Sequence, residues 1–88
     1  MKTVKGAAMA KERRFSTIDI NLSSFLELNG LHASLELIKG KVVFVFPAND
    51  TLYKLLEAYN SNSPVPVGDF VTRLKILRGQ MLTMRGQR

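Results

Sequence analysis

Hydrophobic residues recur every three or four positions in the stretch FSTIDINLSSFLELNG, which is the spacing of one helical face. Ser16 or Thr17 offers a hydroxyl that can cap the free amides of the first turn, and Asp19 completes a capping-box pattern with Ser16. Asn29-Gly30 is a stop signal, because both residues tolerate the left-handed conformation that ends helices. A helix is therefore predicted between these signals. Its apolar face consists of Ile18, Leu22, Phe25 and Leu26.

The period changes to two in the next stretch, LHASLELIKGKVVFVF, where apolar residues alternate with polar ones as in a half-buried strand. Lys39-Gly40 can form the turn of a hairpin, since glycine readily adopts the positive φ that a tight turn requires. Five apolar residues follow at 42–46, and Pro47 ends this second strand because it lacks a backbone donor. The pattern predicts a two-stranded antiparallel hairpin.

The second strand of this hairpin is apolar on both faces. Val42, Phe44 and Phe46 point to one face, which helices can cover, and Val43 and Val45 point to the other. A short, uncharged and β-prone segment pairs with itself when it is exposed. We therefore expect a homodimer that uses Val43 and Val45, with helix cover of both faces within one chain as the alternative.

Two further helices are predicted in the C-terminal half. The stretch ANDTLYKLLEAYN begins with Asn49 or Asp50 as a cap and carries its leucines on one face. The proline-containing linker SNSPVPVG separates it from a third helix that starts at Val67. The predicted fold class is α+β, a two-stranded antiparallel hairpin packed by three helices in the order αββαα. The predicted boundaries are a flexible basic arm at 1–14, one domain at 15–84 and a basic tail at 85–88.

The composition restricts the class of protein. The chain has 88 residues, 45% of them hydrophobic, so a single small globular domain is the default. It contains no cysteine, which excludes disulfides, thiol catalysis and cysteine-ligated zinc. Its basic N-terminal stretch lacks the apolar core of a secretory signal, and no apolar run approaches the roughly 20 residues of a membrane helix. We expect a soluble cytoplasmic protein without a membrane span.

The net charge of +6 is concentrated at the two ends of the chain. Residues 1–14 carry +4 and residues 73–88 carry +5, whereas the residues between them carry −3. Basic ends on a small protein favour binding to a polyanion such as DNA or RNA, although they can also serve solubility alone. The candidate nucleic-acid contacts are Lys2, Lys5, Lys11, Arg13, Arg14, Arg73, Lys75, Arg78, Arg85 and Arg88.

No catalytic motif is visible. His32 is the only histidine and lies at a polar position of the first strand, without further ligands or a catalytic partner nearby in the sequence. Asp19, Asp50 and Asp69 stand at the starts of predicted helices, where a carboxylate stabilises the first turn. The glycines form no phosphate-binding loop. We predict a protein that is not an enzyme and has no cofactor, metal site or small-molecule substrate.

The run FSTIDINLSSFL, then a glycine, then KVVFVF, LYKLLEAYN and VPVGDFVTRLKIL, resembles a family of short bacterial, archaeal and phage proteins catalogued only as a domain of unknown function. The resemblance covers roughly residues 15–78 and implies a stand-alone small domain, sometimes in mobile-element contexts. It implies no activity, cofactor or catalytic residue. The residues that carry it are Phe15, Thr17, Asp19, Leu22, Phe25, Leu26, Gly30, Val42, Phe44, Phe46, Tyr59, Asn60, Val65 and Leu74.

Two functions follow from the sequence. The first is a non-enzymatic, nucleic-acid-associated accessory protein that uses its basic ends. The second is a homodimeric protein-interaction or structural module in which the basic ends have no nucleic-acid role. Mutations in the basic ends would affect only the first function, whereas mutations at Val43 and Val45 would affect only the second.

Overall fold

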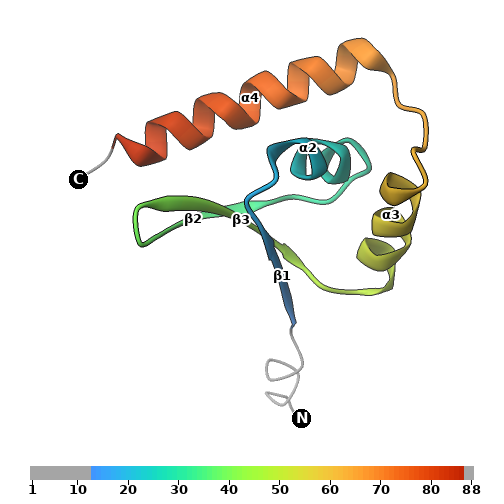
Figure 1. The fold of residues 1–88 in the computed structure, drawn as a ribbon, viewed down its shortest axis with the longest axis horizontal. Helices are drawn as coiled ribbons and strands as arrows, with labels where there is room; N and C mark the ends of the chain where they lie inside the picture. The colour runs from blue at the N-terminus through green and yellow to red at the C-terminus, as the bar shows by residue number, and fades with distance from the viewer. Residues whose placement is uncertain (1–12, 87–88) are drawn as a thin grey trace.

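The fold is α+β, with three helices and a three-stranded antiparallel sheet (Figure 1). A computed structural model describes residues 13–86. Strand β3 lies in the centre of the sheet, between β1 and β2. The elements in chain order are β1 (Arg14–Thr17), α2 (Ile20–Leu28), β2 (Ser34–Ile38), β3 (Lys41–Pro47), α3 (Asp50–Asn60) and α4 (Val67–Arg85).

The prediction of a two-stranded hairpin is corrected by β1, a strand at the place where the sequence suggested the start of a helix. Phe15 lies opposite Phe46 in the antiparallel register, and Thr17 lies opposite Phe44. The apolar strand β3 has two edges, and the β2 hairpin satisfies the backbone groups of only one. The segment from Arg14 to Thr17 pairs with the other edge, so the element order is βαββαα. The strand also begins one residue before the predicted domain boundary.

The start of α2 corrects the predicted cap as well. Asp19 is the N-cap residue, and its carboxylate accepts hydrogen bonds from the amides of Asn21 at 2.9 Å and Leu22 at 3.1 Å. Thr17 does not cap the helix but holds the cap residue, because its hydroxyl accepts a hydrogen bond from the Asp19 amide at 3.0 Å. The predicted stop is confirmed, since α2 ends at Leu28 and Gly30 has a φ of +97°.

The predicted hairpin and the two C-terminal helices are confirmed. Lys39 and Gly40 form the turn with φ values of +51° and +81°, the two positive values of a type I′ turn. Asn49 caps α3 through a 2.9 Å hydrogen bond from the Leu52 amide. Helix α4 continues through Gly79, so the basic tail predicted to begin at residue 85 has its first residue in the helix.

The helices pack on one face of the sheet. In Figure 1, α2 lies between the sheet and the long helix α4, and α3 closes one side. Phe44 and Phe46 of β3 are buried on this face together with residues from all three helices, so each element contributes to one core. The buried core cluster consists of Leu22, Phe25, Leu26, Phe44, Phe46, Leu52 and Leu77.

The opposite face of the sheet is covered by polar side chains instead of a helix. Val45 is only 6% exposed there, and Val43 is half-buried. Arg14 of β1 forms an ion pair with Glu36 of β2. The strand registers place Val45 beneath the diagonal that joins these two residues across β3. Val45 is therefore not the exposed residue that the sequence suggested, and self-association through the valines stays a prediction.

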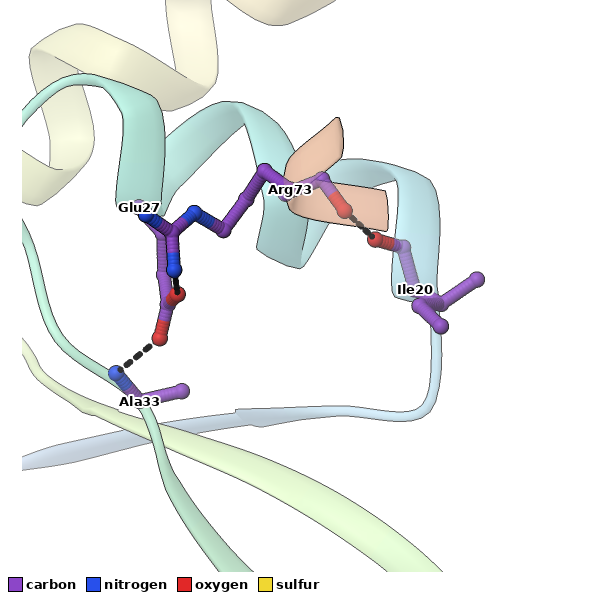
Figure 2. Close-up of polar contacts among 5 residues, drawn as sticks. Ile20, Glu27, Ala33 and Arg73 are labelled. Atoms are coloured by element: carbon purple, nitrogen blue, oxygen red, sulfur yellow. Dashed lines mark hydrogen bonds and ion pairs between the residues drawn. The ribbon is translucent and has the colours of Figure 1, made fainter. Parts of the chain in front are cut away.

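A carboxylate at the end of α2 joins three elements. Glu27 accepts a hydrogen bond from the Ala33 amide, just before β2, at 3.0 Å, and its other oxygen lies 3.5 Å from the guanidinium of Arg73 in α4 (Figure 2). The Glu27 side chain is only 12% exposed, whereas that of Arg73 is 38% exposed. Because a largely buried carboxylate needs partners, these contacts fix α4 and the entry to β2 relative to α2.

We predict that Glu27→Ala lowers the free energy of unfolding by about 2–3 kcal/mol, because it removes a charged acceptor and leaves the Ala33 amide without its partner. Glu27→Gln should have a smaller effect, since an amide oxygen can still accept that hydrogen bond. Chemical denaturation measured by circular dichroism tests both variants.

The control is Glu57→Ala, at an exposed position of α3, which should change the stability by no more than about 0.5 kcal/mol. Equal stabilities for the Glu27→Ala and Glu57→Ala proteins would show that the Glu27 contacts contribute nothing to the fold.

Candidate nucleic-acid interface

Six of the ten predicted contact residues lie in the part of the chain that the structure describes, and the other four lie outside it. The four outside residues are Lys2, Lys5, Lys11 and Arg88. The six described residues fall in two places. Arg13 directly precedes β1 and Arg14 is its first residue, whereas Arg73, Lys75, Arg78 and Arg85 lie along α4.

Two of the six are engaged in intramolecular ion pairs. Arg14 pairs with Glu36 across the open face of the sheet, and Arg73 pairs with Glu27. The Arg73 side chain also has its Nε atom buried among protein atoms. Binding of a phosphate by either residue would break a contact within the fold, so neither is a good candidate for the interface.

The structure does not bring together the two basic stretches of the sequence, the one that ends at Arg14 and the one in α4. Arg14 lies opposite Pro47, the last residue of β3. Arg85 lines the same surface pocket as Lys41, the first residue of β3. A seven-residue strand spans about 20 Å, so the two basic regions are separated by the length of β3. They are two sites at opposite ends of the sheet and not one continuous surface.

The hairpin turn adds two cations that the sequence interpretation did not include. Lys39 lies in the turn, and Lys41 begins β3 next to the last turns of α4. Figure 1 shows the hairpin tip and the C-terminal end of α4 on the same side of the molecule. The pocket between them has a volume of about 230 Å³, and no acidic residue lines it. Its lining consists of Ile18, Gly40, Lys41, Val42, Met81 and Arg85.

Arg78 extends this cluster along α4. It precedes Arg85 by seven residues, or nearly two helical turns, so both side chains leave the same side of the helix, about 10 Å apart. Lys75 lies elsewhere, since it lines a groove between α4 and β2. We call the cluster the basic end. It consists of Lys39, Lys41, Arg78 and Arg85, which are all exposed and form no ion pair with any residue at 13–86.

Sequence reasoning missed Lys39 and Lys41 because the signal is tertiary. The Lys-Gly-Lys turn is visible in the chain, but its position beside Arg85 depends on how α4 crosses the sheet. Gly40 keeps the turn tight, so the two lysines stay close to each other.

The acidic residues and the histidine take structural or solvent-exposed places. Asp19 caps α2, and Asp50 and Asp69 lie in the first turns of α3 and α4. His32 is exposed ahead of β2. Within residues 13–86, no three histidine or acidic side chains are grouped in a way that could hold a metal ion. These residues therefore add no chemistry to the basic end.

The aromatic residues are used mainly in packing. The Tyr59 ring packs against Phe25 with centroids 5.4 Å apart and planes tilted by 56°. Burial raises the pKa of the Tyr59 phenol above its ordinary value of 10.0, and the negative charge of Asp19 raises it further. Tyr53 is half exposed, but it lies on α3, away from the basic end (Figure 1).

A model of one protein family, described as Domain of unknown function (DUF5659), matches residues 12–83. The chain belongs to this family. The DUF5659 match includes every strand and helix except the last residues of α4, and it therefore extends further at both ends than the resemblance seen in the sequence. It contains Lys39, Lys41 and Arg78 and stops just before Arg85. No curated protein and no solved structure matches the chain.

The helices within residues 13–86 are α2, α3 and α4. None of them is both long enough and apolar enough to cross a membrane.

The pKa of Tyr59 can be tested in a Tyr53→Phe protein, where Tyr59 is the only tyrosine. We predict an ionisation midpoint above 10 for the native protein and close to 10 in denaturant, measured by absorbance at 295 nm. The folded state holds this proton more tightly, so its contribution to stability is complete below pH 10 and is lost as the pH rises through the folded pKa. A native midpoint at or below 10 would contradict the packing seen around Tyr59.

Proposed function

We propose that this protein is a non-enzymatic, nucleic-acid-associated accessory factor whose basic end binds the phosphate backbone. One observation supports the proposal above the others. The fold brings Lys41, at the hairpin turn, next to Arg85, at a place where no described acidic side chain neutralises them. Unpaired and exposed cations that converge from distant parts of a chain create a local positive potential that attracts polyanions.

The chemistry of the cluster suits phosphate. Arginine guanidinium groups fork onto phosphate oxygens, and lysines add compact positive charges on flexible stems. Arg78 and Arg85 supply the first kind of contact, and Lys39 and Lys41 supply the second. Each phosphate contact releases condensed counterions, so four contacts to a duplex imply a logarithmic salt slope of about −3.6.

The pocket at the basic end offers no aromatic side chain on which a base could stack. It is lined by aliphatic and basic side chains. Single-stranded nucleic acids are usually held by aromatic stacking, and sequence is read by side chains that reach the base edges. Contacts to the phosphate backbone, with little sequence preference, are therefore what this surface supports.

The decisive variant is Lys41→Glu with Arg85→Glu. We expect it to reduce the affinity for a 20-base-pair duplex at least tenfold and to make the salt slope shallower by about 2, because two phosphate contacts are lost. Fluorescence anisotropy from 50 to 300 mM salt measures both quantities.

The control is Arg13→Glu with Lys54→Glu, which changes the net charge by the same amount at exposed positions away from the basic end. It should reduce binding only slightly. Equal losses in the two variants would mean that total charge alone governs binding. A native protein that shows no binding at 150 mM salt would refute the proposed function.

A further inference from the structure

Strand β2 is an edge of the sheet that no other described element covers. The strand order β1-β3-β2 leaves its outer side without a neighbouring strand. Along this side, backbone amides and carbonyls have no partner strand within residues 13–86, and such a row is a template for pairing with another strand. The second edge, β1, is shorter and has only four residues.

An apolar groove runs beside this edge. It lies between β2 and α4 and has a volume of about 730 Å³. Its apolar lining includes Leu35, Ile76 and Met84, and Lys75, Gln80 and Thr83 of α4 add polar groups. Three large apolar side chains are exposed on β2 and on the groove side of α4. Their exposed fractions are 45% for Leu37, 47% for Ile38 and 41% for Ile76. An open strand edge next to an apolar groove is the geometry of proteins that bind an added strand.

The edge also lacks the usual devices against self-pairing. Natural edge strands are commonly protected by lysine, proline or a bulge, and β2 has the sequence SLELI. Its one charged residue, Glu36, is paired with Arg14. The unpaired cations of the basic end lie beyond the strand, at the turn and on α4. Although the whole chain carries +6, Glu36 is neutralised within each copy by Arg14, so the charges that a second copy would meet are these ion pairs and Lys75 on the α4 side of the groove.

We propose that two copies of this chain join through β2, edge to edge and antiparallel, to form one continuous six-stranded sheet. In this pairing, the β2 strand of the second copy occupies the groove of the first. Leu35 and Leu37 both point to the helix-covered face, since they lie opposite Phe44 and Val42 of β3. In a pairing centred on Glu36, Leu37 of one copy lies opposite Leu35 of the other, at the groove beneath α4.

This pairing differs from the dimer that the sequence suggested. That dimer used Val43 and Val45, but Val45 is already buried within one chain. Pairing through β2 instead buries Leu37 and Ile38, which the single chain leaves exposed, and satisfies the open backbone groups. The arrangement has a two-fold axis and uses both β2 edges, so the β2 contact closes at two copies and leaves only the four-residue β1 edges at the ends of the sheet.

The first test is the mass in solution, measured by sedimentation equilibrium from 10 µM to 1 mM. We expect the native protein to approach twice its chain mass of 9.9 kDa. Leu37→Lys should remain a monomer, because each copy then brings a buried positive charge to the junction. The matched control is Val67→Lys, at an exposed position of α4 that does not line the groove, and it should dimerise like the native protein.

A second variant separates the two possible dimer surfaces. Val43→Lys places the same charge on the open face of the sheet and should leave a β2-paired dimer intact. A native protein that stays monomeric at 1 mM, or forms larger assemblies, overturns the proposal. So does a dimer that survives Leu37→Lys but is lost in Val43→Lys.

Amide hydrogen exchange gives a measurement that needs no substitution. The outward-facing amides of β2 should exchange rapidly in dilute protein, where the edge is open, and at least tenfold more slowly at 1 mM. The inward-facing amides, bonded to β3, serve as an internal reference because their protection does not depend on a second copy. Identical exchange at the two concentrations across residues 34–38 would overturn the proposal even if a variant failed to fold.

Discussion

The structure depends on the requirements of β3, a strand that is apolar on both faces and has two edges to pair. Four of its five central side chains are buried, on two different faces of the sheet. An isolated hairpin could not achieve this in water, because it leaves one edge and at least one face open. The surrounding elements each meet one of these requirements. Strand β1 pairs with the second edge, the helices cover the phenylalanine face, and the Arg14–Glu36 pair lies across the valine face.

The same strand determines where the charges are found. Strand β3 is central and has no charged residue between Lys41 and Pro47. The cations near it therefore lie at its two ends, beside Lys41 at one end and at Arg14 at the other. At the first of these regions, exposed cations come from two separate segments of the chain, the hairpin turn and α4. At the second, Arg14 is already neutralised by Glu36. The sheet therefore separates a region where Lys41 and Arg85 are exposed from another where Arg14 is held in an ion pair within the fold.

Much of this fold could be predicted from local patterns. The hairpin, its Lys-Gly turn, the stop at Asn29-Gly30 and the two C-terminal helices all depend on signals within a few residues. Strand β1 could not be predicted in this way. A serine and a threonine before an aspartate fit a helix cap equally well, and only pairing with β3, about 30 residues later, decides between the two. Glu27 and Arg73 are 46 residues apart in the chain, so their ion pair could not be predicted from local patterns either.

The basic end and the β2 edge are distinct surfaces, but pairing at one would place two copies of the other. In an antiparallel pair centred on Glu36, the hairpin turn at Gly40 lies four residues from the axis, so the two turns point in opposite directions, about 26 Å apart along the strands. A long polyanion that reached the basic end of each copy would be held at two points. The second contact would then form at a high effective concentration. If both proposals hold, weak phosphate contacts at each end would combine into stronger binding only above the concentration at which two copies meet.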